Sequence, residues 1–201
     1  MKIYLASKSP RRHALLKQMA VEFELLLTDT LEIVQPNETA EQYSKRITTE
    51  KLQTAWGTII ANNLPLLPVL CADTEVVVDQ QILGKPQNYQ HAVDILKNYS
   101  GRSHQVITSV GIQYGNYQQI VCDISTVHFA PIPDAAIHTY LAMGDYLDKA
   151  GAYGIQSYIG QYISRIEGCF FSVMGLPLFK VRELLTQLEN ELKQGLQVKH
   201  D

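Results

Sequence analysis

One predicted strand limits the possible structure and function of this chain more than any other stretch, because it carries carboxylate side chains within an apolar run. Residues 70–79 read Leu-Cys-Ala-Asp-Thr-Glu-Val-Val-Val-Asp, an apolar run with Asp73 near its start and Glu75 two residues later. A carboxylate in an apolar strand is costly unless it is paired or binds a metal. A short turn follows, and Lys85 then stands between a glycine and a proline. These charges suggest a site for a metal-bound phosphate, whereas a hairpin whose charged residues face water is the alternative interpretation.

Length and charge limit the classes of protein that fit. The chain has 201 residues, enough for one sizeable core or two small lobes. A formal net charge of −3 argues against a general nucleic-acid coat, which would be strongly basic. The cysteines, Cys71, Cys122 and Cys169, are odd in number and far apart, so neither a disulfide framework nor a zinc site is indicated. We therefore expect a reducing compartment, buried thiols and no nucleic-acid partner.

The sequence predicts neither a signal peptide nor a membrane span. The apolar run at residues 3–6 is too short for a signal-peptide core, and Pro10 with the two arginines after it interrupts the pattern. There is no run of about eighteen apolar residues. We expect a single domain over residues 1–195 and a loose tail over residues 196–201.

Hydrophobic periodicity predicts strands mixed with helices. A capping box formed by Thr39 and Gln42 should start the longest helix, and Gly115-Asn116 should turn a hairpin. Besides residues 70–79, we expect strands at 3–6, 23–27, 105–114, 117–129 and 161–166. We expect helices from Pro10, at 40–61, at 89–99, from Asp134 to Gly144, and after Pro177 to the end of an apolar stripe at Leu192.

The loop after the first strand has the residues of a phosphate site. Ser9 is a good helix cap and Pro10 a good first helical residue. The amides of that helix start, the hydroxyl of Ser7 and the guanidinium groups of Arg11 and Arg12 should therefore converge, which suits a phosphate group. The alternative is an ordinary capped helix with its arginines in water.

Several familiar catalytic motifs are absent from the sequence. There is no GxxxxGK[ST] loop, no GxGxxG fingerprint, no GxSxG elbow and no HExxH pair. The remaining candidates are carboxylates for a hard cation such as Mg²⁺ and basic side chains for phosphates. Mg²⁺ usually binds through one or two carboxylates plus substrate phosphates, which fits Glu32 and Asp73 with a nucleotide.

Six short motifs in order point to one family. They lie at residues 6–12, 72–74, 84–86, 100–106, 148–156 and 175–178. Together they resemble the Maf family, nucleoside triphosphate pyrophosphatases that are also called septum-formation inhibitors. Any one motif is weak, but six at plausible spacing over nearly the whole chain are highly specific.

The resemblance implies an α/β fold: a long, twisted, mixed β-sheet with flanking helices and two lobes around a cleft, related to the inosine triphosphate pyrophosphatases. It implies hydrolysis of a nucleoside triphosphate to the monophosphate and pyrophosphate with a divalent cation, Mg²⁺ or Mn²⁺. It also implies a homodimer in the cytoplasm. By matched position, Asp73 is the expected proton acceptor and a metal ligand, and Glu32 is a metal-side carboxylate. The expected phosphate-binding residues are Ser7, Arg12, Lys51 and Lys85.

Three positions are similar to the family's dTTP and UTP branch: Arg11, Thr74 and Gln156. The branch that acts on 7-methyl-GTP has tryptophan, glutamine and glutamate there. A neutral glutamine can both donate to and accept from a pyrimidine edge, whereas a glutamate only accepts. Two alternatives remain: an enzyme of the 7-methyl-GTP type or of broad specificity, and a regulatory nucleotide-binding module that acts in cell division without turnover.

Glu75 is the main departure from the family pattern, which usually has an apolar residue there. Strand alternation places Glu75 on the same face as Asp73 and turns Thr74 to the other face. Glu75 is either a further metal-side carboxylate or a solvent-facing residue at the cleft edge. We expect the second.

Overall fold

The computed structural model describes residues 1–195 and contains one seven-stranded mixed sheet. The strand order is β2-β1-β3-β5-β6-β7, and β4 pairs with β3 beside this path. The strands are β1 (Ile3–Leu5), β2 (Phe23–Leu25), β3 (Val69–Val78), β4 (Gln81–Leu83), β5 (Ser103–Tyr114), β6 (Tyr117–Phe129) and β7 (Ile163–Glu167). The helices are α1 (Pro10–Gln18), α2 (Ala40–Ala61), α3 (Tyr89–Tyr99), α4 (Asp134–Ala142), α5 (Phe170–Met174) and α6 (Leu178–Lys193), with 3-10 turns η1 (Ala150–Ala152) and η2 (Tyr158–Tyr162).

The predicted caps start the two helices nearest the site. The Ser9 side chain accepts a hydrogen bond from the Arg12 amide, and Pro10 occupies the first turn of α1. At the start of α2, the Gln42 amide donates to Thr39 Oγ1 over 3.2 Å, and the Thr39 amide donates to Gln42 Oε1 over 2.9 Å. Both helices thus begin at the residues that the sequence indicates.

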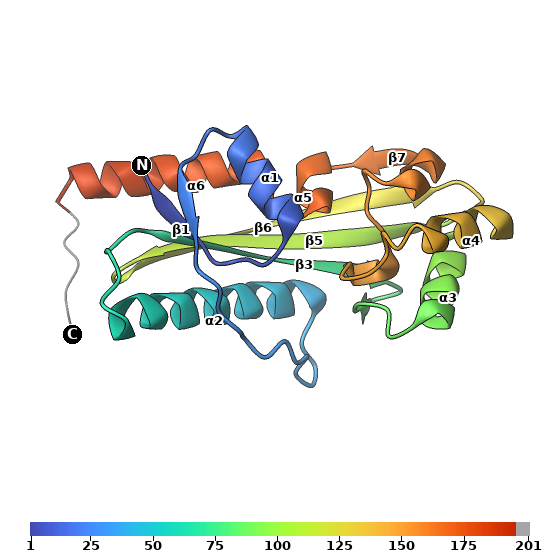
Figure 1. Cartoon of the computed structure of the whole chain (residues 1–201), viewed down its shortest axis with the longest axis horizontal. Coiled ribbons are helices and arrows are strands. Elements are labelled where there is room, and N and C mark those ends of the chain that lie inside the picture. Colours follow the sequence, from blue (N-terminus) through green and yellow to red (C-terminus); the bar gives the residue numbers. More distant parts are fainter. Residues whose placement is uncertain (196–201) are drawn as a thin grey trace.

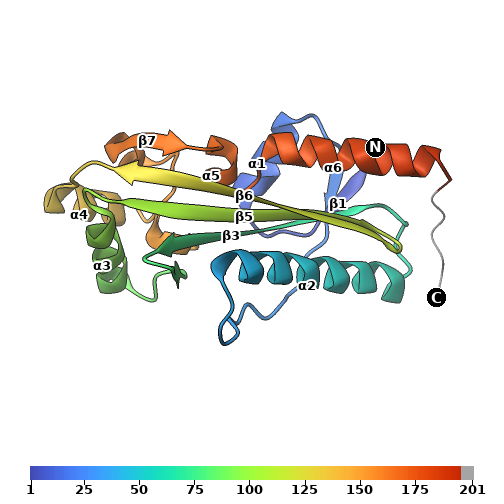
Figure 2. The ribbon, with the colours of Figure 1, turned by 180° about the vertical axis from the view of Figure 1, so that it is seen from behind.

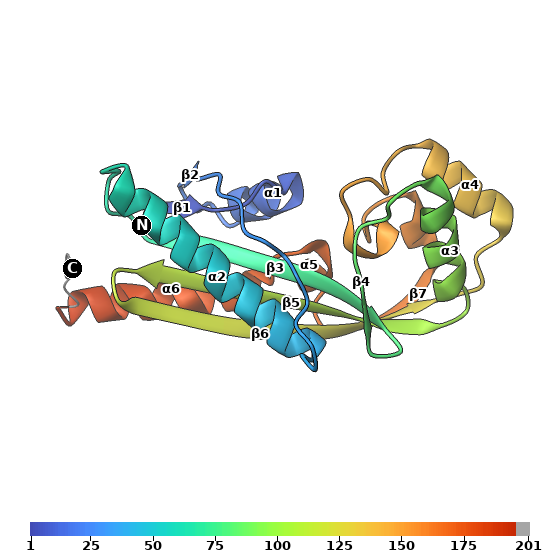
Figure 3. The same cartoon turned by 90° about the horizontal axis from the view of Figure 1, so that it is seen from below.

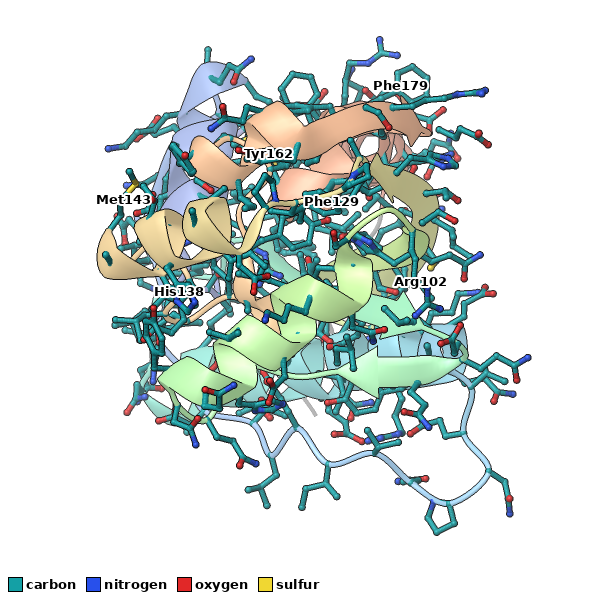
Figure 4. The ribbon with its side chains drawn as sticks, turned by 90° about the vertical axis from the view of Figure 1, so that its right-hand side faces the viewer. Arg102, Phe129, His138, Met143, Tyr162 and Phe179 are labelled. Carbon is teal, nitrogen blue, oxygen red and sulfur yellow. The ribbon has the colours of Figure 1, made fainter. Side chains whose placement is uncertain are left out.

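Helices cover both faces of the sheet and one of its ends. Helix α2 runs along one face, while α1 and α6 lie on the other (Figures 1 and 2). Helices α3 and α4 pack together at the far end of the long strands, away from β1, α2 and α6 (Figure 3). The end-on view shows Phe129 lying inside this end of the molecule, whereas Met143 and Phe179 lie at its surface (Figure 4). The predicted mixed α/β architecture with two lobes is confirmed.

Strand β3 is paired differently along its two edges, and this leaves a gap in the sheet. One edge pairs with β5 from Val69 to Val77 without interruption. On the other edge, β1 pairs with residues 69–70 and β4 with residues 76–78, so no strand of the described chain covers residues 71–75. Asp73, Thr74 and Glu75 all lie beside this gap.

Most predicted elements are present, with differences at their ends. The strand expected at 161–166 is wrong in its start, because Tyr158–Tyr162 forms a 3-10 turn and β7 begins at Ile163. The strand expected at 23–27 ends at Leu25. Helix α5 is not among the predicted elements; its five residues end at Met174, and Gly175 follows with a φ of 115°. The tail expected at residues 196–201 lies outside the described residues. No helix between residues 1 and 195 is both long and apolar enough to cross a membrane.

Candidate active site

Lys51 joins two of the predicted site carboxylates. Its ammonium nitrogen lies 2.6 Å from Asp73 Oδ1 and 2.6 Å from Glu32 Oε1. Lys51 therefore turns toward the sheet from α2, whereas its neighbour Lys45 pairs with Glu41 on the exposed side. Burial lowers the pKa of Lys51, but the adjacent Asp73 carboxylate and Glu32 outweigh it and leave the pKa raised. The lysine is thus charged and held in place.

Asp73 and Glu75 lie together on the face of β3 that packs against α2, as strand alternation predicts. Both are buried, with 5% and 8% of their surface exposed. The prediction that Glu75 faces solvent is wrong. Glu75 lies on the face that α2 covers, where burial together with its charge and that of Asp73 raises the pKa of Tyr43 of α2.

The two carboxyl groups have opposite protonation states. Burial acts to raise the pKa of Asp73, but Lys51 and a hydrogen bond from Glu75 hold that pKa below its ordinary value. Burial and the charge of Asp73 together raise the pKa of Glu75 to about 9. At neutral pH the cation-free pair therefore shares one proton, held by Glu75, and Asp73 is ionised. Apart from the Glu75 carboxyl group, the buried Asp73 Oδ2 has no hydrogen-bond partner among residues 1–195.

Arg12 holds the opposite face of β3. Its Nη2 donates to Thr74 Oγ1 over 3.0 Å, and its Nε donates to the Gly175 carbonyl over 2.9 Å. Arg11 donates from Nε to the Met174 carbonyl over 3.3 Å. Burial lowers the pKa of both arginines. Neither guanidinium forms an ion pair within the described part of the chain, so both remain available to an anionic ligand.

The loop after β1 brings Ser7 to the gap in the sheet. The Ser7 hydroxyl accepts from the Ser9 amide over 3.2 Å, and the His13 ring donates to the Ser7 carbonyl over 2.7 Å. The Ala6 amide donates to the Leu70 carbonyl over 2.9 Å. By alternation, the amides of residues 72 and 74 point the same way, into the gap. Serine hydroxyl, helix start and strand amides thus surround one place, as a phosphate site requires.

Lys85 and Gln156 are exposed and make no side-chain hydrogen bond or ion pair within residues 1–195. The Gly151 amide donates to the Gly84 carbonyl over 3.1 Å, so their two loops are tied together. Gly151 has a φ of 68°, and a Cβ there would lie 2.4 Å from the Tyr99 hydroxyl, so the tie requires glycine. The structure brings Glu32, Lys51 and Asp73 into direct contact, and Arg12 with Thr74. Lys85 and Gln156 remain exposed and bind none of these residues.

The donor set fits a hard divalent cation. Oxygen ligands are available at Asp73 Oδ2, at the Glu75 carboxyl and, on the exposed side, at Glu32. No cluster of three or more histidine, cysteine, aspartate or glutamate side chains in the described residues forms a complete cage. That pattern suits Mg²⁺ or Mn²⁺, which take one or two carboxylates and complete their shell with water and substrate phosphates.

The residues that hold Thr74 were not predicted from the sequence. Thr108 Oγ1 lies 3.1 Å from Thr74 Oγ1 and donates to the Ser172 carbonyl over 2.8 Å. Thr108 lies opposite Thr74 in the β3–β5 register. Only that register, which the sequence does not state, links residues so far apart in the chain.

Comparisons with known proteins identify the family of this chain. Residues 2–188 match the family described as Maf-like protein. The dTTP/UTP pyrophosphatase of Chromobacterium violaceum is 42% identical over 191 residues, which cover 95% of this chain and 96% of the relative. The nucleoside triphosphate pyrophosphatase of Haemophilus ducreyi is 44% identical, with 95% and 97% covered. The dTTP/UTP pyrophosphatase of an Escherichia coli O6 strain is 41% identical, with 99% and 98% covered.

Among solved structures, the Staphylococcus aureus Ham1 protein matches 67% of this chain and 73% of its own, with 14% identity and a TM-score of 0.44. This likeness is too weak to support an argument. The near full-length identity to several curated relatives and the match over residues 2–188 are decisive, and the chain belongs to the Maf family.

Proposed function

We propose that this protein hydrolyses nucleoside triphosphates, with dTTP and UTP as its main substrates, to the monophosphate and pyrophosphate. One observation carries the proposal: Asp73 is ionised and no basic group binds its Oδ2, while Arg11 and Arg12 have no carboxylate partner in residues 1–195. A buried proton acceptor thus lies one residue along β3 from Thr74, which Arg12 binds. A proton acceptor can activate a water molecule, and the cationic groups can bind the phosphate chain that this water attacks.

In the proposed reaction, a water oxygen attacks the α-phosphorus and the bond from that phosphorus to the α–β bridging oxygen breaks. Asp73 accepts the proton of the attacking water. Pyrophosphate leaves with the electron pair of the broken bond. Arg11 and Arg12 from α1, Lys51 from α2 and Lys85 from the loop after β4 offset the charge that develops on it.

Asp73 and Glu32 are the proposed ligands of a divalent cation. Bound there, Mg²⁺ or Mn²⁺ would supply Lewis-acid charge neutralisation at the phosphates. Lys51 contacts both carboxylates at 2.6 Å and so fixes their separation before any ligand binds. The role of Lys51 is to orient these ligands as well as to bind phosphate.

Base selection is proposed to lie with Arg11, Thr74 and Gln156. Gln156 is exposed, and its side-chain amide can both donate to and accept from a pyrimidine edge. Asp148 lies in the loop that leads to Gln156, and its charge acts on Arg11 of α1. Helix α1 and this loop therefore face one another. Support for the pyrimidine preference comes from the names of the relatives in C. violaceum and E. coli.

We also propose a single functional domain over residues 1–195, a homodimer and a cytoplasmic location. One sheet runs through all described strands, which supports the single domain. The dimer and the location rest on the family resemblance, and the three free cysteines are consistent with a reducing compartment. Light scattering of the purified protein tests the dimer.

The direct test is pyrophosphate release from a panel of nucleotides with Mg²⁺ or Mn²⁺. We expect release from dTTP and UTP to exceed release from 7-methyl-GTP. A preference for 7-methyl-GTP would overturn the branch assignment. Binding without release from any triphosphate would instead favour the regulatory module.

A further inference from the structure

Glu75 is a buried acid without a basic partner of its own. Only 8% of its surface is exposed, and three valines follow it in β3. No ion pair joins Glu75 to a lysine or arginine within residues 1–195, because Lys51 is engaged by Asp73 and Glu32. A carboxyl group buried in this way is costly to the fold unless a ligand uses it.

Asp73 provides a second, independent observation at the same place. Its Oδ1 is taken by Lys51, and apart from the Glu75 carboxyl group its buried Oδ2 has no hydrogen-bond partner in the described chain. Asp73 and Glu75 leave β3 on the same side by alternation, the side on which Lys51 of α2 meets Asp73. Helix α2 crosses the sheet on one face (Figure 3). The Glu75 carboxyl group and Asp73 Oδ2 are therefore adjacent, and Lys51 engages the other Asp73 oxygen.

We propose that Glu75 is a ligand of the divalent cation, which it binds together with Asp73 Oδ2. This inference rests on the proposed function, since it places the cation of that reaction. Glu75 and Asp73 supply two oxygens, and water and substrate phosphates supply the rest, as Mg²⁺ and Mn²⁺ prefer. Glu32 then serves mainly to hold Lys51, to which it is bound at 2.6 Å.

The charge balance of the site agrees with this assignment. Among the described residues, Lys51 is the one cation paired with any of the three carboxyl groups, and it pairs with Glu32 and Asp73 but not with Glu75. Arg12 bonds to Thr74 on the opposite face of β3 and forms no ion pair with any of them. A bound divalent cation reverses the repulsion between Asp73 and Glu75 and supplies the missing positive charge.

The test is Mn²⁺ binding. It is measured as the loss of the free Mn²⁺ signal in electron paramagnetic resonance. Wild type, Glu75→Gln and Glu75→Asp are compared with and without α,β-methylene dTTP, which cannot be hydrolysed at the reacting bond. Glu191→Gln, an exposed change on α6 away from the site, is the matched control for loss of one negative charge. Analogue binding in EDTA reports nucleotide affinity without metal.

We expect Glu75→Gln to raise the Mn²⁺ dissociation constant about 10-fold or more. Glu75→Asp should have a smaller effect, and Glu191→Gln none. Analogue affinity in EDTA should not fall in any variant. Equal Mn²⁺ affinity in wild type and Glu75→Gln would overturn the inference, as would a wild type that binds no Mn²⁺.

Failure of the proposed function has a different signature. A wild type that binds Mn²⁺ but releases no pyrophosphate from any triphosphate would refute hydrolysis, and the comparison with Glu75→Gln would still decide the ligand. Thermal unfolding in EDTA verifies that Glu75→Gln is folded. Glu75→Asp keeps the carboxylate, so its binding constant decides the question if the glutamine variant does not fold.

Discussion

The ammonium nitrogen of Lys51 lies 2.6 Å from Oδ1 of Asp73, two residues that come from α2 and β3. The side chain of Lys51 is 16% exposed and that of Asp73 is 7% exposed, so the pair is largely shielded from water. The contact leaves the second Asp73 oxygen free. The same lysine thus keeps Asp73 ionised and leaves its other oxygen unoccupied by a basic group.

Removing Lys51 should destabilise the fold far more than removing an exposed lysine. Lys51→Met leaves Asp73 and Glu75 buried without a cation, and we expect a loss of about 3 kcal/mol in the free energy of unfolding. Lys45→Met removes an exposed pair with Glu41 on the same helix and should cost about 0.5 kcal/mol. Urea unfolding of both variants in EDTA measures the difference. Equal losses would show that Lys51 does not neutralise the buried carboxyl groups.

Glu75 should make the metal-free protein less stable as pH rises. Its pKa is raised from 4.5 to about 9 in the folded state. The folded state therefore binds the proton more tightly, and this contribution is complete below pH 4.5 and is lost between pH 4.5 and 9. Glu75→Gln removes the effect. Its stability relative to wild type should rise by up to about 1.4 kcal/mol per pH unit across that window.

Urea unfolding at several pH values in EDTA measures this slope, with Glu191→Gln as the matched control. Asp73 has the opposite sign: its pKa is lowered from 3.8, so its contribution is present above pH 3.8 and is lost as the medium becomes more acidic. The two effects fall in separate windows. A stability difference between Glu75→Gln and wild type that does not vary with pH would contradict the shared proton.

Arg12 should require its planar guanidinium as well as its charge. Arg12→Lys keeps the charge but loses the paired bonds to Thr74 and the Gly175 carbonyl. We expect KM for dTTP to rise about 10-fold, since each well-placed charged hydrogen bond contributes roughly 1.5–3 kcal/mol. Arg182→Lys, exposed on α6, is the control. An unchanged KM in Arg12→Lys would remove Arg12 from the phosphate site.

Gln156 should set the base preference without affecting the fold. Gln156→Glu replaces an amide that donates and accepts with a carboxylate that only accepts. The ratio of kcat/KM for dTTP to that for 7-methyl-GTP should fall about 10-fold. Gln161→Glu introduces the same change in η2 and should leave the ratio unaltered. Identical ratios in Gln156→Glu and wild type would show that Gln156 does not read the base.

Local signals in the sequence predict the fold well where they are strong. The Thr39 and Gln42 capping box and the Ser9-Pro10 start fix their helices to the residue. Weak local signals fail, as in α5 and η2, which are short and held by tertiary contacts such as the Thr108 bond to the Ser172 carbonyl.

The candidate site divides in the same way. Motifs predict which residues matter, and alternation predicts that Asp73 and Glu75 share a face. The burial of Glu75 was not predictable, because it depends on how α2, with Tyr43, packs over this face of β3. Lys45, Arg46 and Lys51 are equivalent by composition, and only the packing of α2 on the sheet turns Lys51 inward.

The most direct test of the account is pyrophosphate release by Asp73→Asn compared with Asp79→Asn. Asp79 lies just beyond the end of β3, is exposed, and pairs with Arg102 at 2.8 Å, so it provides the same substitution outside the site. We expect Asp73→Asn to lower kcat for dTTP by about 100-fold or more while remaining folded. Asp79→Asn should match wild type. Full activity in Asp73→Asn would contradict the central claim that Asp73 accepts the proton.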